Sequence, residues 1–280
     1  MLLIVGTPLG NREDLSPRAR AAILGADVLF CEDTRSPVRL LGDGHELPPR
    51  RSCFVGNEHE RTRELLALLE DGKRVAFLSE AGMPCWSDPG QLLVRAAIDA
   101  GHAVDVIPGP TAVATAVCHS GLPSEEVRFC GFPPRSGGAR SEWLASLVGE
   151  TATTVCYEAG NRVAGLLDDL ARALPDAATR KVVIARELTK LHQETIRGTV
   201  EELRVKIDDA LLGEVSVVLA PAAIARGELA QQHAARVLEV VLDASKKPRE
   251  KARLLAELTG LPARELYARL GHREPDEEVP

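Results

Sequence analysis

The stretch that decides the fold reads SEAGMPCWSDPG and runs from Ser79 to Gly90. A short apolar run at 75–78 precedes it, and an amphipathic helical pattern at 91–100 follows it. A strand, a loop and a helix in this order place the loop at the carboxyl end of a parallel strand, which is the edge where open α/β sheets bind ligands. The loop has twelve residues, whereas a βα connection usually has about two to six. We therefore predict a ligand-binding loop rather than an ordinary turn.

Strand and helix patterns alternate on both sides of this loop. In the first half, apolar runs predict strands at 2–5, 28–31, 53–55, 75–78 and 104–107. Helical patterns separate them at about 16–25, before Gly42, and at 57–71, 91–100 and 111–119. Such alternation is typical of a mostly parallel sheet that helices cover.

The second half predicts a different sheet. A breaker-rich stretch at 131–138 marks a boundary or a loop. Strands are expected at 153–157, 182–185, 194–198 and 215–219, and helices at 140–148, 161–173 and 200–210. Several of these strands follow one another without a long crossover, so a mixed sheet is expected. From about residue 228 the pattern is wholly helical and ends in a helix-turn-helix outline. We predict an α/β protein with domains at 1–118 and 119–222 and a helical extension at 228–273.

Bulk composition limits the function classes. The 280 residues carry a net charge of −7, which argues against indiscriminate binding of nucleic acid through bulk charge. Residues 245–273 nevertheless hold eight Lys and Arg against three Glu, a net charge of +5. The six cysteines form no CxxC pair, which favours a reducing compartment. No signal peptide pattern opens the chain, and prolines and glycines interrupt the uncharged run at 106–124, so we expect a cytoplasmic protein without a membrane span.

Polar or turn-forming motifs follow other predicted strands as well. GTPLGN begins at Gly6, CEDTR spans 31–35, and VIPGPTA brings Thr111 to a tight turn. GTPLGN lacks the spacing of a dinucleotide loop. CEDTR concentrates two carboxylates and a guanidinium, which can orient a polar substrate or can form a helix cap with a surface ion pair. The pattern leaves both interpretations open.

Two motifs of the second half place charges directly after apolar strands. CYEAGNR spans 156–162 and ARELTKLHQE spans 185–194. Their charged or titratable members are Glu158, Arg162, Arg186, Glu187, Lys190 and His192. This density favours a functional edge, with a solvated edge as the alternative. The histidines at 59, 119 and 192 show no metal-ligand spacing, so no metal is expected.

Taken in order, these motifs resemble those of the tetrapyrrole methylase superfamily, which has the class III fold of S-adenosylmethionine (SAM)-dependent methyltransferases. SGLP at 120–123 and GFPPR at 131–135 belong to the same ordered set. Within the superfamily the chain most resembles the small-subunit ribosomal RNA methyltransferase I family, which methylates the 2′-oxygen of a cytidine in 16S rRNA. The resemblance covers about residues 2–220, and the final helices resemble that family's C-terminal extension.

The resemblance implies a cytoplasmic homodimer of two-domain subunits that bind SAM in the cleft between the domains and act on 16S rRNA or on the assembled small subunit. Carried over by position, the residues expected against SAM are Pro8, Glu80, Ala81, Gly82, Met83, Cys85, Ser87, Thr111, Ala112, Tyr157, Ala220 and Pro221.

Catalytic residues are expected at two strand ends. A ribose hydroxyl is a poor nucleophile, so a nearby base should accelerate its reaction. The candidates are Asp33 and Glu187 as proton acceptors, with Arg35 and Lys190 holding phosphate. If Asp33→Ala and Glu187→Ala kept normal turnover with SAM still bound, this assignment would be wrong.

Departures from the family pattern keep two alternatives open. The family usually has Asp in place of Glu80, Thr in place of Met83, and Ser-Pro-His in place of residues 159–161. Its loop after GFxPR is usually richer in Lys and Arg, and it usually closes with Val-Glu-Gly where this chain has Leu-Ala-Pro at 219–221. One alternative is a methyltransferase of a small tetrapyrrole intermediate. The other is a non-catalytic relative that binds RNA or the ribosome. Local cations in the C-terminal helices and in ARELTKLHQE favour an RNA substrate.

Overall fold

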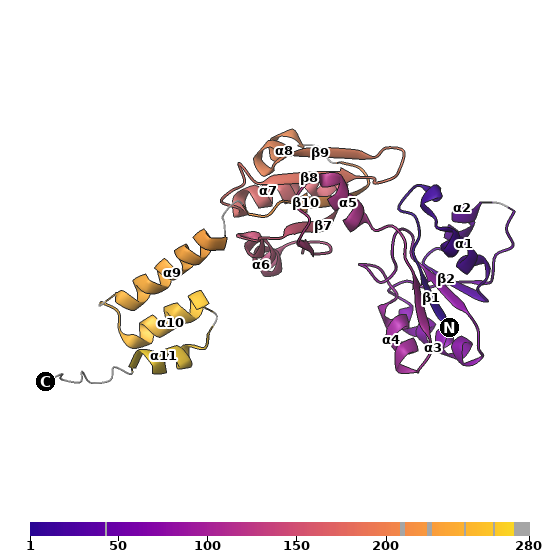
Figure 1. The fold of residues 1–280 in the computed structure, drawn as a ribbon, viewed down its shortest axis with the longest axis horizontal. Coiled ribbons are helices and arrows are strands. Elements are labelled where there is room, and N and C mark those ends of the chain that lie inside the picture. Colours follow the sequence, from indigo (N-terminus) through magenta and orange to yellow (C-terminus); the bar gives the residue numbers. More distant parts are fainter. Residues whose placement is uncertain (43, 208–210, 223–225, 244, 260, 272–280) are drawn as a thin grey trace. The chain divides into compact units, whose positions relative to one another are not determined.

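The computed structural model describes residues 1–42, 44–207, 211–222, 226–243, 245–259 and 261–271. Contacts divide the chain into two compact units, Met1–Pro221 and Ala222–Pro280. Both sheets belong to the first unit (Figure 1).

The first sheet is wholly parallel. Its strands are β1 (Leu2–Val5), β2 (Val28–Cys31), β3 (Arg50–Ser52), β4 (Val75–Leu78) and β5 (Val104–Ile107), in the order β3-β2-β4-β1-β5. Leu2 of the interior strand β1 lies opposite Val75 on one side and Val104 on the other. Every residue of β1, β2 and β4 is buried, as expected for a parallel sheet that is covered on both faces.

Helices cover both faces of this sheet (Figure 1). Helices α1 (Pro17–Leu24) and α2 (Ser36–Leu41) pack on one face, where Ile23 and Leu41 are buried with Val5. Helices α3 (Glu58–Glu70) and α4 (Gln91–Asp99) pack on the other, where Leu65 and Leu93 are buried with Phe77. The short helix η1 (Arg12–Asp14) lies between β1 and α1. The loops that follow the strands are therefore left at the carboxyl edge.

The second sheet is mixed, as predicted. Its strands are β6 (Val127–Phe129), β7 (Thr153–Ala159), β8 (Lys181–Arg186), β9 (Glu194–Thr199) and β10 (Glu214–Leu219), in the order β6-β7-β10-β8-β9. Only β6 and β7 run parallel, and the other neighbours are antiparallel. Because β10 runs against β7 and β8, its amino end lies beside their carboxyl ends.

Helices also pack on this sheet. Helix α5 (Ala112–Ser120) packs on one face through Val113, Ala116 and Val117. Helices α6 (Gly137–Leu147), α7 (Val163–Ala173) and α8 (Val200–Lys206) contribute to the other core, and η2 (Gly160–Arg162) precedes α7. The domain boundary predicted at residue 118 falls inside α5, and the division of 1–221 into two domains stays a prediction.

The predicted elements differ from the observed ones at the sheet edges. The strand expected at 53–55 is instead β3 at Arg50–Ser52, and β6 was not anticipated. Both are edge strands of three residues that carry charged side chains, a common feature of strands that must not pair with another chain. Their local sequences therefore lack an apolar run. Helix α8 ends at Lys206, and 208–210 of the predicted helix lie outside the described residues.

The second unit contains the predicted helices. They are α9 (Arg226–Leu242), α10 (Pro248–Thr259) and α11 (Ala263–Gly271). Helices α10 and α11 form the predicted helix-turn-helix, whose turn residue 260 and final residues 272–273 lie outside the described part. Arg249 lies over the ring of Tyr267, 5.8 Å from its centroid. Within the described ranges, no helix combines the length and the apolar character that a membrane crossing requires.

Candidate active site

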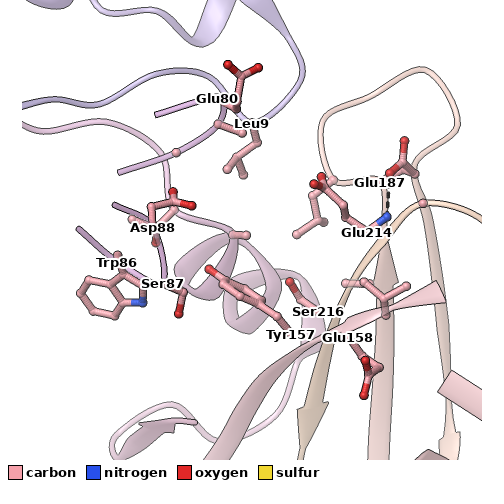
Figure 2. Close-up of a pocket in the computed structure, with 18 of the residues that line it drawn as sticks. Leu9, Glu80, Trp86, Ser87, Asp88, Tyr157, Glu158, Glu187, Glu214 and Ser216 are labelled. Atoms are coloured by element: carbon pink, nitrogen blue, oxygen red, sulfur yellow. Dashed lines mark hydrogen bonds between the residues drawn. The ribbon is translucent and has the colours of Figure 1, made fainter. Parts of the chain in front are cut away.

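A cavity of about 460 Å³ lies in the first unit, between the loops at the carboxyl edge of the first sheet and one edge of the second. Leu9, Glu32, residues 80–83 and residues 86–88 line it from the loops after β1, β2 and β4. The ends of β7 and β8 and the start of β10 form the opposite wall, where Glu187 and Glu214 lie (Figure 2). Small-molecule sites usually have about 300–1,000 Å³. The predicted loop thus borders a cavity of suitable size.

The loop after β4 is held at both of its ends. Thr7 and Gly82 exchange two backbone hydrogen bonds of 2.8 and 3.1 Å, which tie it to the loop after β1. At the other end the buried carboxylate of Glu58 accepts hydrogen bonds from the backbone N–H groups of Gly90 (2.9 Å) and Leu92 (3.0 Å). A carboxylate from α3 thus serves the first turn of α4, where free N–H groups and the helix dipole favour a negative charge.

Glu58→Ala is expected to lower the free energy of unfolding by about 1–3 kcal/mol, because a buried and a partly buried N–H group lose a charged acceptor. Urea unfolding of the variant would measure the change. Glu60→Ala is the matched control, since Glu60 lies on the same helix with its side chain 71% exposed. Equal urea midpoints for Glu58→Ala and the wild type would contradict this role.

Backbone strain concentrates in two loops beside the cavity. Among the described residues, four that are not glycine have positive φ: Cys85 (69°), Ser87 (60°), Glu187 (50°) and Thr189 (64°). The first two lie in the loop after β4 and the others in the loop after β8. Non-glycine residues rarely adopt this region, and such strain is typical of functional sites. Ser87 and Glu187 line the cavity.

The charge of the lining is strongly negative. Six acidic residues line the cavity, Glu32, Glu80, Asp88, Glu158, Glu187 and Glu214, whereas Lys190 is the single cation among the lining residues. The carboxylate of Glu158 is buried and paired with Arg162, so the other five supply the negative charge of the lining. Such a lining suits a cationic ligand. In the part of the chain that the structure describes, no three His, Cys, Asp or Glu side chains form a group able to hold a metal ion.

Asp88 has the most strongly altered titration among these carboxylates. Burial raises its pKa to about 6, and the negative charges of Glu32, Glu214 and Glu80 add to this rise. Burial also raises the pKa of Glu32, and the charge of Glu80 contributes. A carboxyl group with a pKa near 6 is suited to exchange a proton close to neutral pH.

Glu187 and Lys190 form an ion pair in the cavity wall. Lys190 Nζ lies 3.1 Å from Glu187 Oε1 and 2.9 Å from Glu214 Oε2. The N–H group of Glu214 donates to Glu187, and this bond is the main cause that lowers the pKa of Glu187. Burial lowers the pKa of Lys190, but its bonds to Glu214 and Glu187 outweigh burial and raise the pKa overall. Both groups are therefore held in their charged forms.

Asp33 and Arg35 form an ion pair next to the cavity but do not line it. Arg35 donates to both carboxylate oxygens of Asp33, at 2.8–3.0 Å, and these bonds hold the pKa of Asp33 far below its usual value. The N–H group of Asp33 donates to Glu80 Oε1 at 3.1 Å, so the pair adjoins the cavity through Glu80. No side chain caps α2. CEDTR therefore forms the surface ion pair but no side-chain cap of the helix. A role of Asp33 in the reaction stays a prediction.

Eight of the twelve residues expected against the cofactor line this cavity. They are Glu80, Ala81, Gly82, Met83, Ser87, Thr111, Ala112 and Tyr157.

The other four expected residues lie elsewhere. Pro8 borders a small hollow of about 40 Å³ beside α2. Burial raises the pKa of the Cys85 thiol to about 11, and its sulfur lies against Gly90. Ala220 follows β10 and donates to the carbonyl oxygen of Lys181, at the start of β8. Because β10 is antiparallel to β8, Ala220 and the adjoining Pro221 lie at the sheet edge opposite to the cavity.

Several lining residues were not singled out from the sequence. They include Leu9, Trp86, Asp88, Phe132 and Glu214. Trp86 and Asp88 belong to the loop that is predicted to bind a ligand, so their position in this loop could have identified them as lining residues. Glu214 carried no such signal, because it begins a strand whose direction the local sequence does not reveal.

Known proteins resemble this chain along most of its length. The family model of the tetrapyrrole (corrin/porphyrin) methylases matches residues 1–204. A protein of Mycobacterium tuberculosis named ribosomal RNA small subunit methyltransferase I is 45% identical over 225 residues, which are 79% of this chain and 78% of that protein. A Thermotoga maritima protein of the same name is 42% identical over 219 residues, 78% of this chain and 97% of that protein.

A solved structure shares the fold. Uroporphyrin-III C-methyltransferase of Thermus thermophilus, in complex with S-adenyl homocysteine, has a TM-score of 0.56 at 19% identity and covers 78% of this chain and 96% of its own. Together with the two sheets described above, this likeness confirms the fold class that the motifs predicted. The chain belongs to the tetrapyrrole methylase family and, within it, to the ribosomal RNA small subunit methyltransferase I proteins.

Proposed function

We propose that the protein transfers a methyl group from SAM to the ribose 2′-hydroxyl of a cytidine in small-subunit rRNA. The relatives' names support a ribosomal RNA substrate, and the choice of cytidine and of its 2′-oxygen rests on the resemblance of the motifs. The observation that carries the proposal is the acidic cavity bordered by two strained loops, because SAM brings a positive charge on sulfur.

The residues of the cavity fit SAM. Its volume lies in the range of small-molecule sites, and its carboxylates offer negative charge to a sulfonium. Gly82 has a φ of 77°, which favours glycine, and a Cβ atom there would lie 3.3 Å from Leu9. Because it has no side chain, its backbone at the cavity is open to a ligand. When bound, SAM supplies an activated methyl group. The chain's part is to orient the reacting groups and exclude water, which can lower the activation barrier by up to about 7–11 kcal/mol.

Asp88 is the lining carboxylate whose pKa best suits a proton acceptor, and it lies in the strained loop after β4. Loss of the hydroxyl proton needs a base whose pKa lies near the working pH. The pKa of Asp88 is raised to about 6, whereas the pKa values of Asp33 and Glu187 are lowered by their partners. We therefore assign proton acceptance to Asp88. Glu187 and Lys190 stabilise the cavity wall of the second sheet through their ion pair. Arg35 is available to an RNA phosphate.

Mass mapping of ribosomal RNA from cells with and without the protein tests the reaction. The expected result is one 2′-O-methylated cytidine that disappears with the protein and returns when purified enzyme and SAM are added to small subunits. An unchanged methylation pattern, together with methylation of a tetrapyrrole, would support the small-molecule alternative. Absence of SAM binding by calorimetry would support the non-catalytic alternative.

The C-terminal helices supply phosphate contacts in this proposal. Helix α10 carries Arg249, Lys251 and Arg253, and Lys246 and Lys247 precede it.

We further propose that the enzyme is a cytoplasmic homodimer, as the family resemblance implies. Light scattering of the purified protein would test the dimer.

Reversing two exposed charges, Lys247→Glu and Arg253→Glu, is expected to weaken RNA binding and to reduce its salt dependence. Each lost phosphate contact lowers the slope of log K against log salt by about 0.7–0.9, so the loss of two should lower it by about 1.4–1.8. Arg63→Glu with Arg95→Glu, on the exposed faces of α3 and α4, is a control with the same change of charge. Equal slopes for the α10 variant and the control would remove this helix from the RNA interface.

A further inference from the structure

Aromatic residues cluster at one side of the cavity, where Trp86, Phe132 and Tyr157 line it and Phe129 contacts Trp86 and Tyr157. The chain has two Trp, two Tyr and five Phe, and four of these nine form a connected cluster. The ring of Phe129 lies 5.7 Å from that of Trp86 and 4.9 Å from that of Tyr157, and Phe132 lies 5.5 Å from Tyr157. We name this set, Trp86, Phe129, Phe132 and Tyr157, the aromatic wall.

The outer rings of the aromatic wall remain exposed. Trp86 is 49% and Phe132 is 56% exposed, although both line the cavity. The buried rings of Phe30 and Phe77, in the first sheet, are by contrast 0% exposed. Leaving large apolar rings in water forgoes the stabilisation of burial, so exposed rings grouped at a cavity indicate a surface for a ligand.

The backbone fixes Trp86 in this exposed position. Cys85 and Ser87, its two neighbours, both have positive φ. The N–H group of Cys85 donates to the carbonyl oxygen of Pro89 at 3.1 Å, which closes the turn around the indole. Such conformations raise the energy of the folded chain and persist only where surrounding contacts hold them. The backbone conformation of the loop therefore fixes the exposed position of the Trp86 side chain (Figure 2).

The loop of Phe132 is fixed in a similar way. Gly131 has a φ of 62°, and its carbonyl oxygen accepts a hydrogen bond of 2.9 Å from the N–H group of Tyr157. Arg140 donates to the carbonyl oxygen of Pro134 at 2.8 Å and pairs with Asp169 at 2.6 Å. Arg135, three residues after Phe132, is exposed. The loop therefore offers a fixed ring and, nearby in sequence, a cation.

We propose that the aromatic wall is a stacking site for an unpaired nucleobase of the RNA, the base of the acceptor nucleotide. The inference rests on the proposed function and names the subsite that the RNA base occupies. Proteins recognise RNA mainly through unstacked bases that lie on aromatic side chains, with Arg or Lys at the phosphates. Trp86 and Phe132 supply such rings, and Arg135 is available to a phosphate.

The exposure of the rings favours the RNA base over the adenine of the methyl donor. A small ligand is usually buried over about 70–90% of its surface. An RNA base, in contrast, enters from solvent while its strand stays outside, so its platform must be accessible from the surface. Rings that are half exposed at the cavity meet this need.

Trp86→Ala and Phe132→Ala test the site. Each is expected to raise KM for small-subunit RNA by roughly 5- to 150-fold, the equivalent of one lost base–aromatic contact, with the Kd of SAM within about twofold of the wild type. Trp86→Phe should restore most of the affinity, because it keeps an aromatic ring. Phe54→Ala is the matched control, since Phe54 is 48% exposed but does not line the cavity.

Tryptophan fluorescence tests base stacking on Trp86 without requiring methyl transfer. The chain has a second tryptophan, Trp143, so Trp143→Phe leaves Trp86 as the single tryptophan, which excitation beyond the tyrosine absorption band selects. Adding an RNA oligonucleotide that carries the target, in saturating S-adenosylhomocysteine, should quench this emission, as a stacked base would. Quenching by S-adenosylhomocysteine alone, with a raised Kd for SAM in Trp86→Ala, would assign the wall to the adenine and overturn the proposal.

Two outcomes distinguish a wrong stacking site from a wrong function. If the wild type methylates RNA and Trp86→Ala and Phe132→Ala match it in KM, the stacking site is wrong while the proposed function stands. If the wild type methylates no RNA and RNA leaves the emission of Trp86 unchanged, the proposed function and the stacking site are both overturned.

Discussion

Asp88→Asn is expected to reduce kcat for RNA methylation by about 10²- to 10⁴-fold while the Kd of SAM stays within a few-fold of the wild type. The amide keeps the shape of the side chain but cannot accept the hydroxyl proton. Asp33→Asn and Glu187→Gln are informative companions, because the sequence predicts these two residues as bases. Asp99→Asn, an exposed carboxylate paired with Arg95, is the control. A large loss of kcat in either companion variant, with normal turnover by Asp88→Asn, would move the proton acceptor to that residue.

The pH profile of the wild type follows from the same assignment. Asp88 accepts a proton only as a carboxylate, and its pKa is raised to about 6. The value of kcat/KM should therefore rise as the pH increases through about 6 and level off above about 7. A profile that is flat from pH 5 to 8 would contradict this assignment.

Asp88→Asn should also stabilise the fold at neutral pH. Because the folded-state pKa is above the unfolded value, the fold disfavours the carboxylate, and the wild type loses stability as the pH rises from about 4 through about 6. The variant has no such loss. Urea unfolding at pH 8 should show it to be more stable by about 1–2 kcal/mol, after allowance for solvent screening of this half-buried group, and the gain should vanish near pH 4.

Gly109→Ala is expected to destabilise the protein by about 1–3 kcal/mol or more and to weaken SAM binding, since the backbones after β1 and β5 meet at this residue. A Cβ atom on Gly109 would lie 2.8 Å from the Cα atom of Gly6, and one on Gly6 would lie 2.6 Å from the Cα atom of Gly109. Neither obstacle is a flexible side chain. The two strand ends must therefore separate, and the cavity loops that follow them must move.

Urea unfolding and calorimetry with SAM would measure both effects. Gly165→Ala is the matched control, because Gly165 lies inside α7 with no atom within 4 Å of an added Cβ. In a helix this change should stabilise the protein by about 0.5–1 kcal/mol. An unchanged urea midpoint for Gly109→Ala would show that the strand ends tolerate a methyl group.

The sequence predicts the interior of the fold well because buried strands such as β1 and β4 are continuous apolar runs. Edge strands carry a weaker signal. The run at 53–55 looks like a strand, and the N–H group of Cys53 still donates to the carbonyl oxygen of Cys31 in β2 at 2.8 Å. The chain then leaves the sheet, because the N–H group of Phe54 donates to Asn57 Oδ1 at 2.8 Å instead. The preceding Arg50–Ser52 pairs with β2 on one side only, so its side chains need not be apolar.

The candidate site could be predicted where it depends on parallel strands. Their carboxyl ends share one edge, so Glu80, Ser87 and Thr111 could be grouped from order alone. The altered titration of Asp88 could not be predicted, because it arises from burial and from carboxylates on three separate segments. The sequence also does not reveal whether a strand runs parallel or antiparallel to its neighbours. For this reason the motifs predict Ala220 beside the ligand loops, whereas it lies at the far end of the antiparallel strand β10.

The four residues with left-handed backbones bear on any attempt to make this enzyme more robust. Glycine is the lower-energy residue at such positions, so a library selected only for thermal tolerance would drift towards glycine at 85, 87, 187 and 189. At least two of these side chains cannot be given up freely. Thr189 accepts a hydrogen bond from the N–H group of Asn11, and Glu187 holds Lys190. A redesign should therefore keep these four identities constant and seek its gains on the outer helices.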